Sequence, residues 1–273
     1  LDLRQYRSKQ PANQADTAAI NSNSRTLLGP QQTNWLQANL LISTARWKML
    51  GNSVQMAPVY VIPSFLGNAA ALFGLDPTST TPTPFNVDSW DGYNESRRQI
   101  LGAIAGVGTG RPPVGNCVFL TGDIHSNFSC DIPADPTTPY SPATSLSLGT
   151  EYVCASVTSD NLNEIVGAPE RIPGISPDGY VSSNSAATFE LLLKGVNGWI
   201  RDLNLDLHGY SVVDVTPART QVDNWVLTSS ASVAFAADPR IDPNAGCIFR
   251  SAYQTLNLTQ KTIPAAGPLG PRA

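Results

Sequence analysis

The strongest constraint on the fold is an uninterrupted run of apolar and β-prone residues, Cys117-Val118-Phe119-Leu120-Thr121. A run of this length without polar alternation is typical of a strand that is covered on both faces. It is followed directly by Gly122-Asp123-Ile124-His125. Because ligands in open α/β sheets bind beyond the carboxyl ends of the strands, these four residues stand where a site is expected.

Asp123 and His125 carry the chemistry of this segment. They lie two positions apart after the strand, so both side chains can point to one place in the mouth of the sheet. A carboxylate oxygen and an imidazole nitrogen suit the harder divalent and trivalent metals, and a metal there can polarise a phosphoryl group or activate water. The alternative is that Asp123 only caps a turn.

The only other histidine, His208, repeats the spacing in Asp206-Leu207-His208. It precedes a predicted strand instead of following one, which favours a structural role and leaves His125 as the one catalytic histidine. A site with two metals needs about four to seven converging ligands. The neighbouring sequence does not obviously complete such a set.

Length and charge limit the class of protein. The 273 residues contain no internal repeat and no clear linker, which predicts a single domain over 1–273. Charged residues make up 14% of the chain and the net charge is −4, so no nucleic-acid patch is expected. No apolar stretch approaches the roughly 18 residues that span a bilayer. Leu1 opens the chain like the interior of a protein, so we expect a fragment or processed product.

Four cysteines, Cys117, Cys130, Cys154 and Cys247, are too far apart for a CxxC metal clip. An even number in a chain rich in Ser, Thr, Asn and Pro fits a secreted protein with one or two disulfides. The alternative is four buried thiols.

Periodicity and turn signals predict the secondary structure. Helices are expected over 31–41, 95–107 and 186–194, and strands over 46–50, 117–121, 152–157, 209–215 and 225–235, with loops over 75–86 and 131–150. Asn94 or Ser96 is available to cap the second helix.

Several segments together carry a family signal. They are Leu1-Asp2-Leu3-Arg4-Gln5-Tyr6-Arg7, Leu28-Gly29-Pro30-Gln31-Gln32, residues 43–52, Asp88-Ser89-Trp90-Asp91-Gly92-Tyr93, residues 120–126, Gly149-Thr150-Glu151-Tyr152, and His208-Gly209-Tyr210 with Asp214-Val215-Thr216-Pro217. In this order they resemble the PhoD-like phosphatases over about 1–225, and 226–273 is expected to form a terminal strand and tail.

The resemblance implies a fold, an α/β calcineurin-like metallophosphoesterase sandwich of two mixed sheets flanked by helices. The first metal-binding motifs of that family lie upstream of the segment that matches residues 1–7, so the chain resembles the C-terminal half of the catalytic domain. The partner implied is the N-terminal half of the same domain. Asp123 and His125 become candidate ligands of Fe3+ and Ca2+.

The resemblance also gives roles to other residues. Arg4 becomes a candidate for orienting phosphate, a role that its planar guanidinium suits, and the alternative is an ion pair with Asp2 or another carboxylate. A second set of residues is expected to hold the binding residues in place without contacting the substrate. This set is Asp88, Trp90, Asp91 and Tyr93. Two departures from the family pattern, Asn197-Gly198-Trp199 and Asn127-Phe128 after Ser126, affect local substrate contacts.

The implied function is hydrolysis of small phosphate monoesters or diesters by metal-activated hydroxide, as in a secreted or extracytoplasmic alkaline phosphatase. One alternative is a phosphodiesterase of the phospholipase D type. Another is an inactive fragment or a secreted binding module that lacks the upstream metal ligands.

Overall fold

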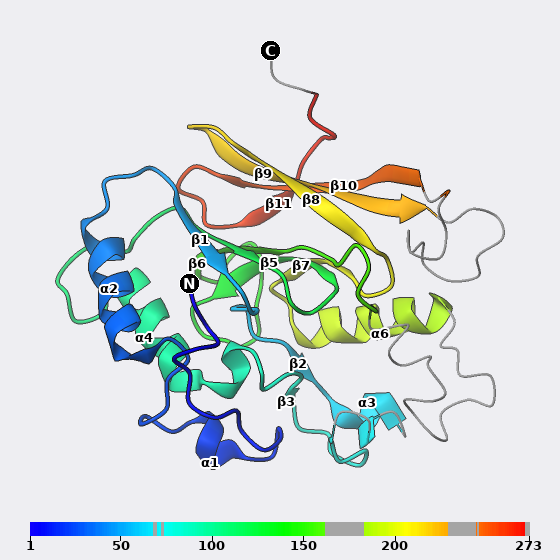
Figure 1. The fold of residues 1–273 in the computed structure, drawn as a ribbon, viewed down its shortest axis with the longest axis horizontal. Coiled ribbons are helices and arrows are strands. Elements are labelled where there is room, and N and C mark those ends of the chain that lie inside the picture. The colour runs from blue at the N-terminus through cyan, green and yellow to red at the C-terminus, as the bar shows by residue number, and fades with distance from the viewer. Residues whose placement is uncertain (68–69, 72–73, 162–182, 229–243, 245, 271–273) are drawn as a thin grey trace.

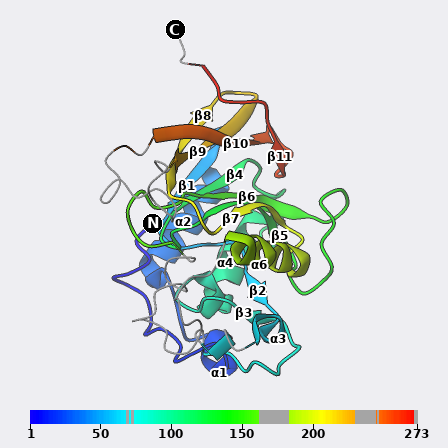
Figure 2. The same cartoon turned by 90° about the vertical axis from the view of Figure 1, so that its right-hand side faces the viewer.

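Two packed β-sheets form the body of the protein (Figures 1 and 2). The computed structural model describes residues 1–273 except 68–69, 72–73, 162–182, 229–243, 245 and 271–273. A five-stranded sheet has the order β1 (Lys48–Asn52), β4 (Cys117–Thr121), β6 (Ser147–Val153), β5 (Asn127–Pro133) and β7 (Ile200–Asn204). A four-stranded sheet has the order β11 (Thr262–Pro264), β10 (Gly246–Leu256), β9 (Arg219–Thr228) and β8 (Gly209–Val215). A short pair joins β2 (Tyr60–Val61) to β3 (Thr83–Pro84).

The helices lie on the side of the five-stranded sheet that is turned away from the four-stranded sheet (Figures 1 and 2). They are α1 (Thr17–Ile20), α2 (Gly29–Ile42), α3 (Pro63–Leu66), the short 3-10 helix η2 (Trp90–Gly92), α4 (Asn94–Ile104) and α6 (Ser183–Val196). Of these, α1 and α3 lie farthest from the sheet (Figures 1 and 2). The predicted sandwich with flanking helices is therefore present. Only the five-stranded sheet is mixed, because every pairing in the four-stranded sheet is antiparallel.

β4 lies inside the sandwich, as its apolar run predicts. Side chains alternate between the two faces of a strand, and each face of β4 meets a different apolar cluster. Phe119 joins the large core toward the helices, whereas Val118 packs with Tyr152 and Val222 between the sheets. Because both faces are covered, the end of β4 is fixed, and with it the start of the Gly122-Asp123-Ile124-His125 turn.

The predicted helices are present as α2, α4 and α6. α2 and α6 extend beyond the predicted ranges at both ends, whereas α4 begins one residue earlier than predicted and ends at Ile104, three residues before the predicted end. Neither Asn94 nor Ser96 caps α4, because the residue before its first turn is Tyr93 and makes no side-chain cap. Ser96 is buried instead, and its hydroxyl accepts a hydrogen bond from the Leu27 amide at 3.2 Å.

The disulfide prediction is wrong. All four cysteines lie in the described part of the chain and none is bonded to another. Cys117 and Cys130 are buried and Cys247 is exposed, so the alternative of four buried thiols is also only partly met. Among the described helices, none has the length and apolarity to cross a membrane.

The last residue of η2, Gly92, packs so closely against the backbone of the preceding loop that no side chain fits there. A Cβ atom built on Gly92 would lie 1.9 Å from the Val87 carbonyl oxygen, so Gly92→Ala must push backbone apart. We expect a loss of about 2–3 kcal/mol in the free energy of unfolding, measured by urea titration. Gly102, inside α4, has no atom within 4 Å of its built Cβ, and Gly102→Ala should stabilise by about 0.5–1 kcal/mol. Equal effects of the two substitutions would contradict this reading.

Candidate active site

The turn after β4 has an unusual backbone. Asp123 and His125 have φ values of 75° and 54°, the left-handed region that non-glycine residues rarely adopt. Each such residue costs about 1–3 kcal/mol and persists only when its surroundings hold it. The Ile124 amide donates to the Gly122 carbonyl at 3.0 Å, and the Cys154 amide donates to the Thr121 carbonyl at 2.9 Å. Strain of this kind, at the carboxyl end of a central strand, marks a candidate site.

Arg4 joins two carboxylates that are far apart in the sequence. Its Nη2 donates to Asp123 Oδ1 at 2.6 Å and its Nη1 donates to Asp88 Oδ2 at 2.5 Å. Arg7 donates from Nη1 to Asp88 Oδ1 at 2.7 Å. The Arg4 side chain is 42% exposed, so this bridge faces the surface and is accessible to a ligand.

The charges in this bridge support one another. Burial by itself raises the pKa of Asp88, but hydrogen bonds and charge from Arg4 and Arg7 outweigh it and leave the pKa below its ordinary value. Burial likewise lowers the pKa of Arg4, and Asp88 and Asp123 more than reverse this. The contact between Arg4 and Asp88 therefore favours the charged form of both groups.

The alternative expected for Arg4, an ion pair with Asp2 or another carboxylate, is met by Asp88 and Asp123 and not by Asp2. Asp2 Oδ1 accepts hydrogen bonds from the backbone amides of Arg4 and Gln5, both at 3.0 Å, and so closes a tight turn. Gln32 on α2 holds Asp2 from the other side, because its Oε1 accepts from the Asp2 amide and its Nε2 donates to the Asp2 carbonyl. This clamp fixes the segment from which Arg4 extends.

His125 is oriented by the backbone of a neighbouring loop. Its Nδ1 lies 2.8 Å from the Asp160 carbonyl oxygen, so Nδ1 carries the proton and donates. The other ring nitrogen, Nε2, then has its lone pair available to a metal, as in histidine ligands whose second nitrogen donates to a carbonyl. His208 is fully buried, with Nδ1 3.2 Å from the Ser156 carbonyl oxygen, which is the structural role favoured for it.

Asp123 and His125 fit two places in a metal-ligand set. Their donors, a carboxylate and an imidazole, are the right chemistry for a hard or borderline cation. In the residues that the structure describes, however, no three His, Cys, Asp or Glu side chains are grouped to hold a metal. The described residues therefore offer Asp123 and His125 as two candidate ligands and no larger group.

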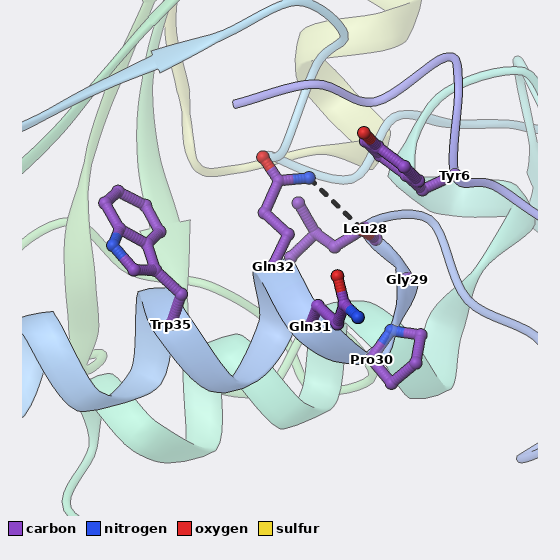
Figure 3. A pocket seen from close by; sticks show the side chains of 7 residues that line it. All are labelled: Tyr6, Leu28, Gly29, Pro30, Gln31, Gln32 and Trp35. Atoms are coloured by element: carbon purple, nitrogen blue, oxygen red, sulfur yellow. Dashed lines mark hydrogen bonds between the residues drawn. The ribbon is translucent and has the colours of Figure 1, made fainter.

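An open hollow of about 690 Å³ lies beside the Arg4 segment (Figure 3). It is lined by Tyr6, Leu28, Gly29, Pro30, Gln31, Gln32 and Trp35. Tyr6 and Trp35 are 60% and 58% exposed. Figure 3 shows Gln32 between these two rings.

The comparisons with known proteins point to one family. Residues 1–224 match the model of the PhoD-like phosphatase family. The chain belongs to this family. It is 32% identical over 230 residues to alkaline phosphatase D of Bacillus subtilis (strain 168), covering 83% of this chain and 32% of that protein. A solved structure described as the structure of PhoD superposes with a TM-score of 0.67 at 24% identity, over 98% of this chain and 41% of that one.

These matches confirm the predicted family and the predicted metallophosphoesterase-like α/β fold. The chain spans less than half the length of each of these relatives. The single-domain division, with a tail from 226, stays a prediction.

The predicted supporting residues of this PhoD-like chain have different positions. Asp88 contacts Arg4 directly, with Nη1 and Oδ2 2.5 Å apart, and its supporting role stays a prediction. Trp90 is buried and donates from Nε1 to Asn52 Oδ1 at 3.1 Å. Asp91 is buried and paired with Arg97. The Tyr93 hydroxyl donates to the Ser8 carbonyl at 2.7 Å, which braces the segment that carries Arg4 and Arg7.

Both departures from the family pattern have structural uses. Asn197 is buried and donates to the carbonyls of Tyr60 and Leu193, each at 2.7 Å. Asn127 is buried and donates to the Val153 carbonyl at 3.0 Å. These two asparagines therefore stabilise the fold through buried hydrogen bonds to backbone carbonyls.

The sequence did not identify Glu151 as a candidate site residue. Glu151, in β6, is completely buried and accepts hydrogen bonds from Thr121, Met56 and Ala57. Burial raises its pKa to about 7, although these donors favour the carboxylate. The available signal was an acidic residue directly before the predicted strand 152–157, and β6 in fact begins earlier, at Ser147, and includes Glu151. An acidic residue in a buried strand is rarely without partners.

Proposed function

We propose that this chain supplies one wall of a metal-dependent phosphoesterase site that hydrolyses small phosphate esters. The observation that carries the proposal is the Arg4 guanidinium held between Asp88 and Asp123, in a chain of the PhoD-like phosphatase family. Asp123 precedes His125 by two residues. An exposed, planar, permanently charged donor set is the group that proteins use to bind phosphate.

The residues of this chain have separate tasks in the proposed reaction. Arg4 binds and orients the phosphoryl oxygens and balances their charge. Asp123 and His125 Nε2 would hold metal, with Fe3+ and Ca2+ proposed from the family, and bound metal would polarise the phosphoryl group and activate water. Asp123 Oδ1 accepts a hydrogen bond from Arg4 Nη2 at 2.6 Å, so the residue that would hold metal also holds Arg4.

The remaining ligands are proposed to come from the N-terminal half of the same catalytic domain. The relatives are two to three times longer than the matched region, since this chain covers 32% and 41% of them. β1 lies at the edge of the five-stranded sheet, and the Leu1 nitrogen donates to the Gly51 carbonyl on that edge at 2.8 Å. We further propose a secreted or extracytoplasmic location.

The test compares two esters with the full-length protein. We expect hydrolysis of p-nitrophenyl phosphate that is lost after chelation and restored by metal. Hydrolysis of bis(p-nitrophenyl) phosphate at a higher kcat/KM would instead assign the diesterase alternative, for which the hollow between Tyr6 and Trp35 offers room. No hydrolysis of either ester by the metal-loaded protein would contradict both and leave a binding module.

A further inference from the structure

Asn52 connects the two carboxylates of the site from behind. Its Oδ1 accepts from Trp90 Nε1 at 3.1 Å, and Trp90 follows Asp88 by two residues. Its Nδ2 lies 3.2 Å from Thr121 Oγ1, and Thr121 precedes Asp123 by two residues. Asn52 therefore links the backbone that carries one carboxylate to the backbone that carries the other.

Glu151 holds this link in place. Its Oε1 accepts from the Thr121 hydroxyl at 2.6 Å and from Asn52 Nδ2 at 3.3 Å. The same oxygen accepts from the Met56 amide at 2.8 Å, and Oε2 accepts from the Ala57 amide at 2.7 Å. Glu151, Asn52 and Thr121 are 0%, 4% and 6% exposed, so water does not compete for these hydrogen bonds.

We infer that Glu151 is a positioning residue. Through Asn52 and Thr121 it sets the separation of Asp88 and Asp123, and that separation decides whether one guanidinium can contact both carboxylates. Arg4 contacts them at 2.5 and 2.6 Å, which leaves little tolerance for movement of either. The inference rests on the proposed function, because the pose of Arg4 matters for phosphate only if Arg4 binds it.

A purely structural role for this network makes a different prediction. In that case the loss of one buried hydroxyl would lower stability wherever it occurs and would not act on the site. β6 provides a matched position, since Thr150 is next to Glu151 and points to the opposite face. Thr150 is also buried, and its Oγ1 lies 2.7 Å from Thr255 Oγ1.

The experiment compares Thr121→Val with Thr150→Val in the full-length, metal-loaded protein. Both should lose about 1 kcal/mol of stability. Only Thr121→Val should lower kcat/KM for p-nitrophenyl phosphate and the affinity for inorganic phosphate, by about 10- to 100-fold. Thr121→Ser, which keeps the hydroxyl, should restore both. Equal kinetic effects of the two valine variants would overturn the inference.

A readout that needs no activity separates this inference from the proposed function. Hydrogen exchange should rise over residues 88–93 and 122–126 together in Thr121→Val and not in Thr150→Val. If neither segment changes in Thr121→Val, the positioning role is wrong even in an active enzyme. If both segments change but the wild type hydrolyses no phosphate ester, the network is as described and the proposed function fails.

Discussion

His125→Ala in the full-length protein should lower kcat/KM for p-nitrophenyl phosphate by about 100- to 1,000-fold. The substitution removes the nitrogen that we assign to the metal, and the loss of about 3–4 kcal/mol of transition-state stabilisation corresponds to that factor. The fold should survive, because His125 is only partly buried and, among the described residues, its ring is held by one hydrogen bond, to the Asp160 carbonyl. Steady-state kinetics and a urea titration measure the two effects.

His208→Gln is the matched control for His125→Ala. His208 is the other histidine of the chain, lies in the same Asp-x-His spacing and is completely buried. We expect His208→Gln to lower stability and to leave kcat/KM within a few-fold of wild type at a temperature where both are folded. If His125→Ala keeps wild-type kcat/KM, His125 has no catalytic role.

Arg97→Met should reduce the free energy of unfolding by about 3–5 kcal/mol, because it leaves a buried carboxylate without its charge partner. Asp91 and Arg97 are 2% and 6% exposed and form an ion pair next to the site. Asp91 would keep only the hydrogen bond from the Val59 amide at 2.9 Å. Urea titration of this chain measures the loss.

The loss of stability in Arg97→Met should change with pH in a direction that the pKa of Asp91 determines. Burial already raises the pKa of Asp91 in the wild type, and without the charge of Arg97 it must rise further. A carboxyl group with a raised folded-state pKa stabilises the folded state below its unfolded pKa and loses this contribution as pH rises. The deficit of Arg97→Met should therefore be larger at pH 8 than at pH 5.

A double variant shows whether the buried charge is the cause. Asp91→Asn removes the charge and keeps an oxygen for the Val59 amide, so Asp91→Asn with Arg97→Met should recover most of the stability lost in Arg97→Met. A double variant no more stable than Arg97→Met would mean that packing of the arginine, and not the charge of Asp91, produces the effect.

The sequence was sufficient for elements whose signal is local. β4 has an uninterrupted apolar run and is buried on both faces, and α2 keeps Leu36 and Leu40 in the core at helical spacing. β5 was not predicted, because Asn127, Ser129 and Asp131 give it the composition of a loop. All three are buried, and Asp131 accepts hydrogen bonds from Thr262 and Tyr140. Such long-range partners are invisible to local pattern.

The candidate site also has residues that local sequence signals reveal and contacts that they do not. Asp123 and His125 were found because their position follows a recognisable strand. Arg4 was found by resemblance, but its two partners lie 84 and 119 residues away, so the bridge itself needed the structure. Glu151 was missed because its donors come from two segments far from it in the sequence, residues 52–57 and Thr121.

The most direct test of a metal-dependent site with Asp123 and His125 in one wall is the metal content of the full-length protein. Iron and calcium per chain are measured by elemental analysis in wild type, His125→Ala and His208→Gln after identical metal loading and desalting. The assignment predicts equal content in wild type and His208→Gln and a substoichiometric content in His125→Ala. Full metal content in His125→Ala would contradict it.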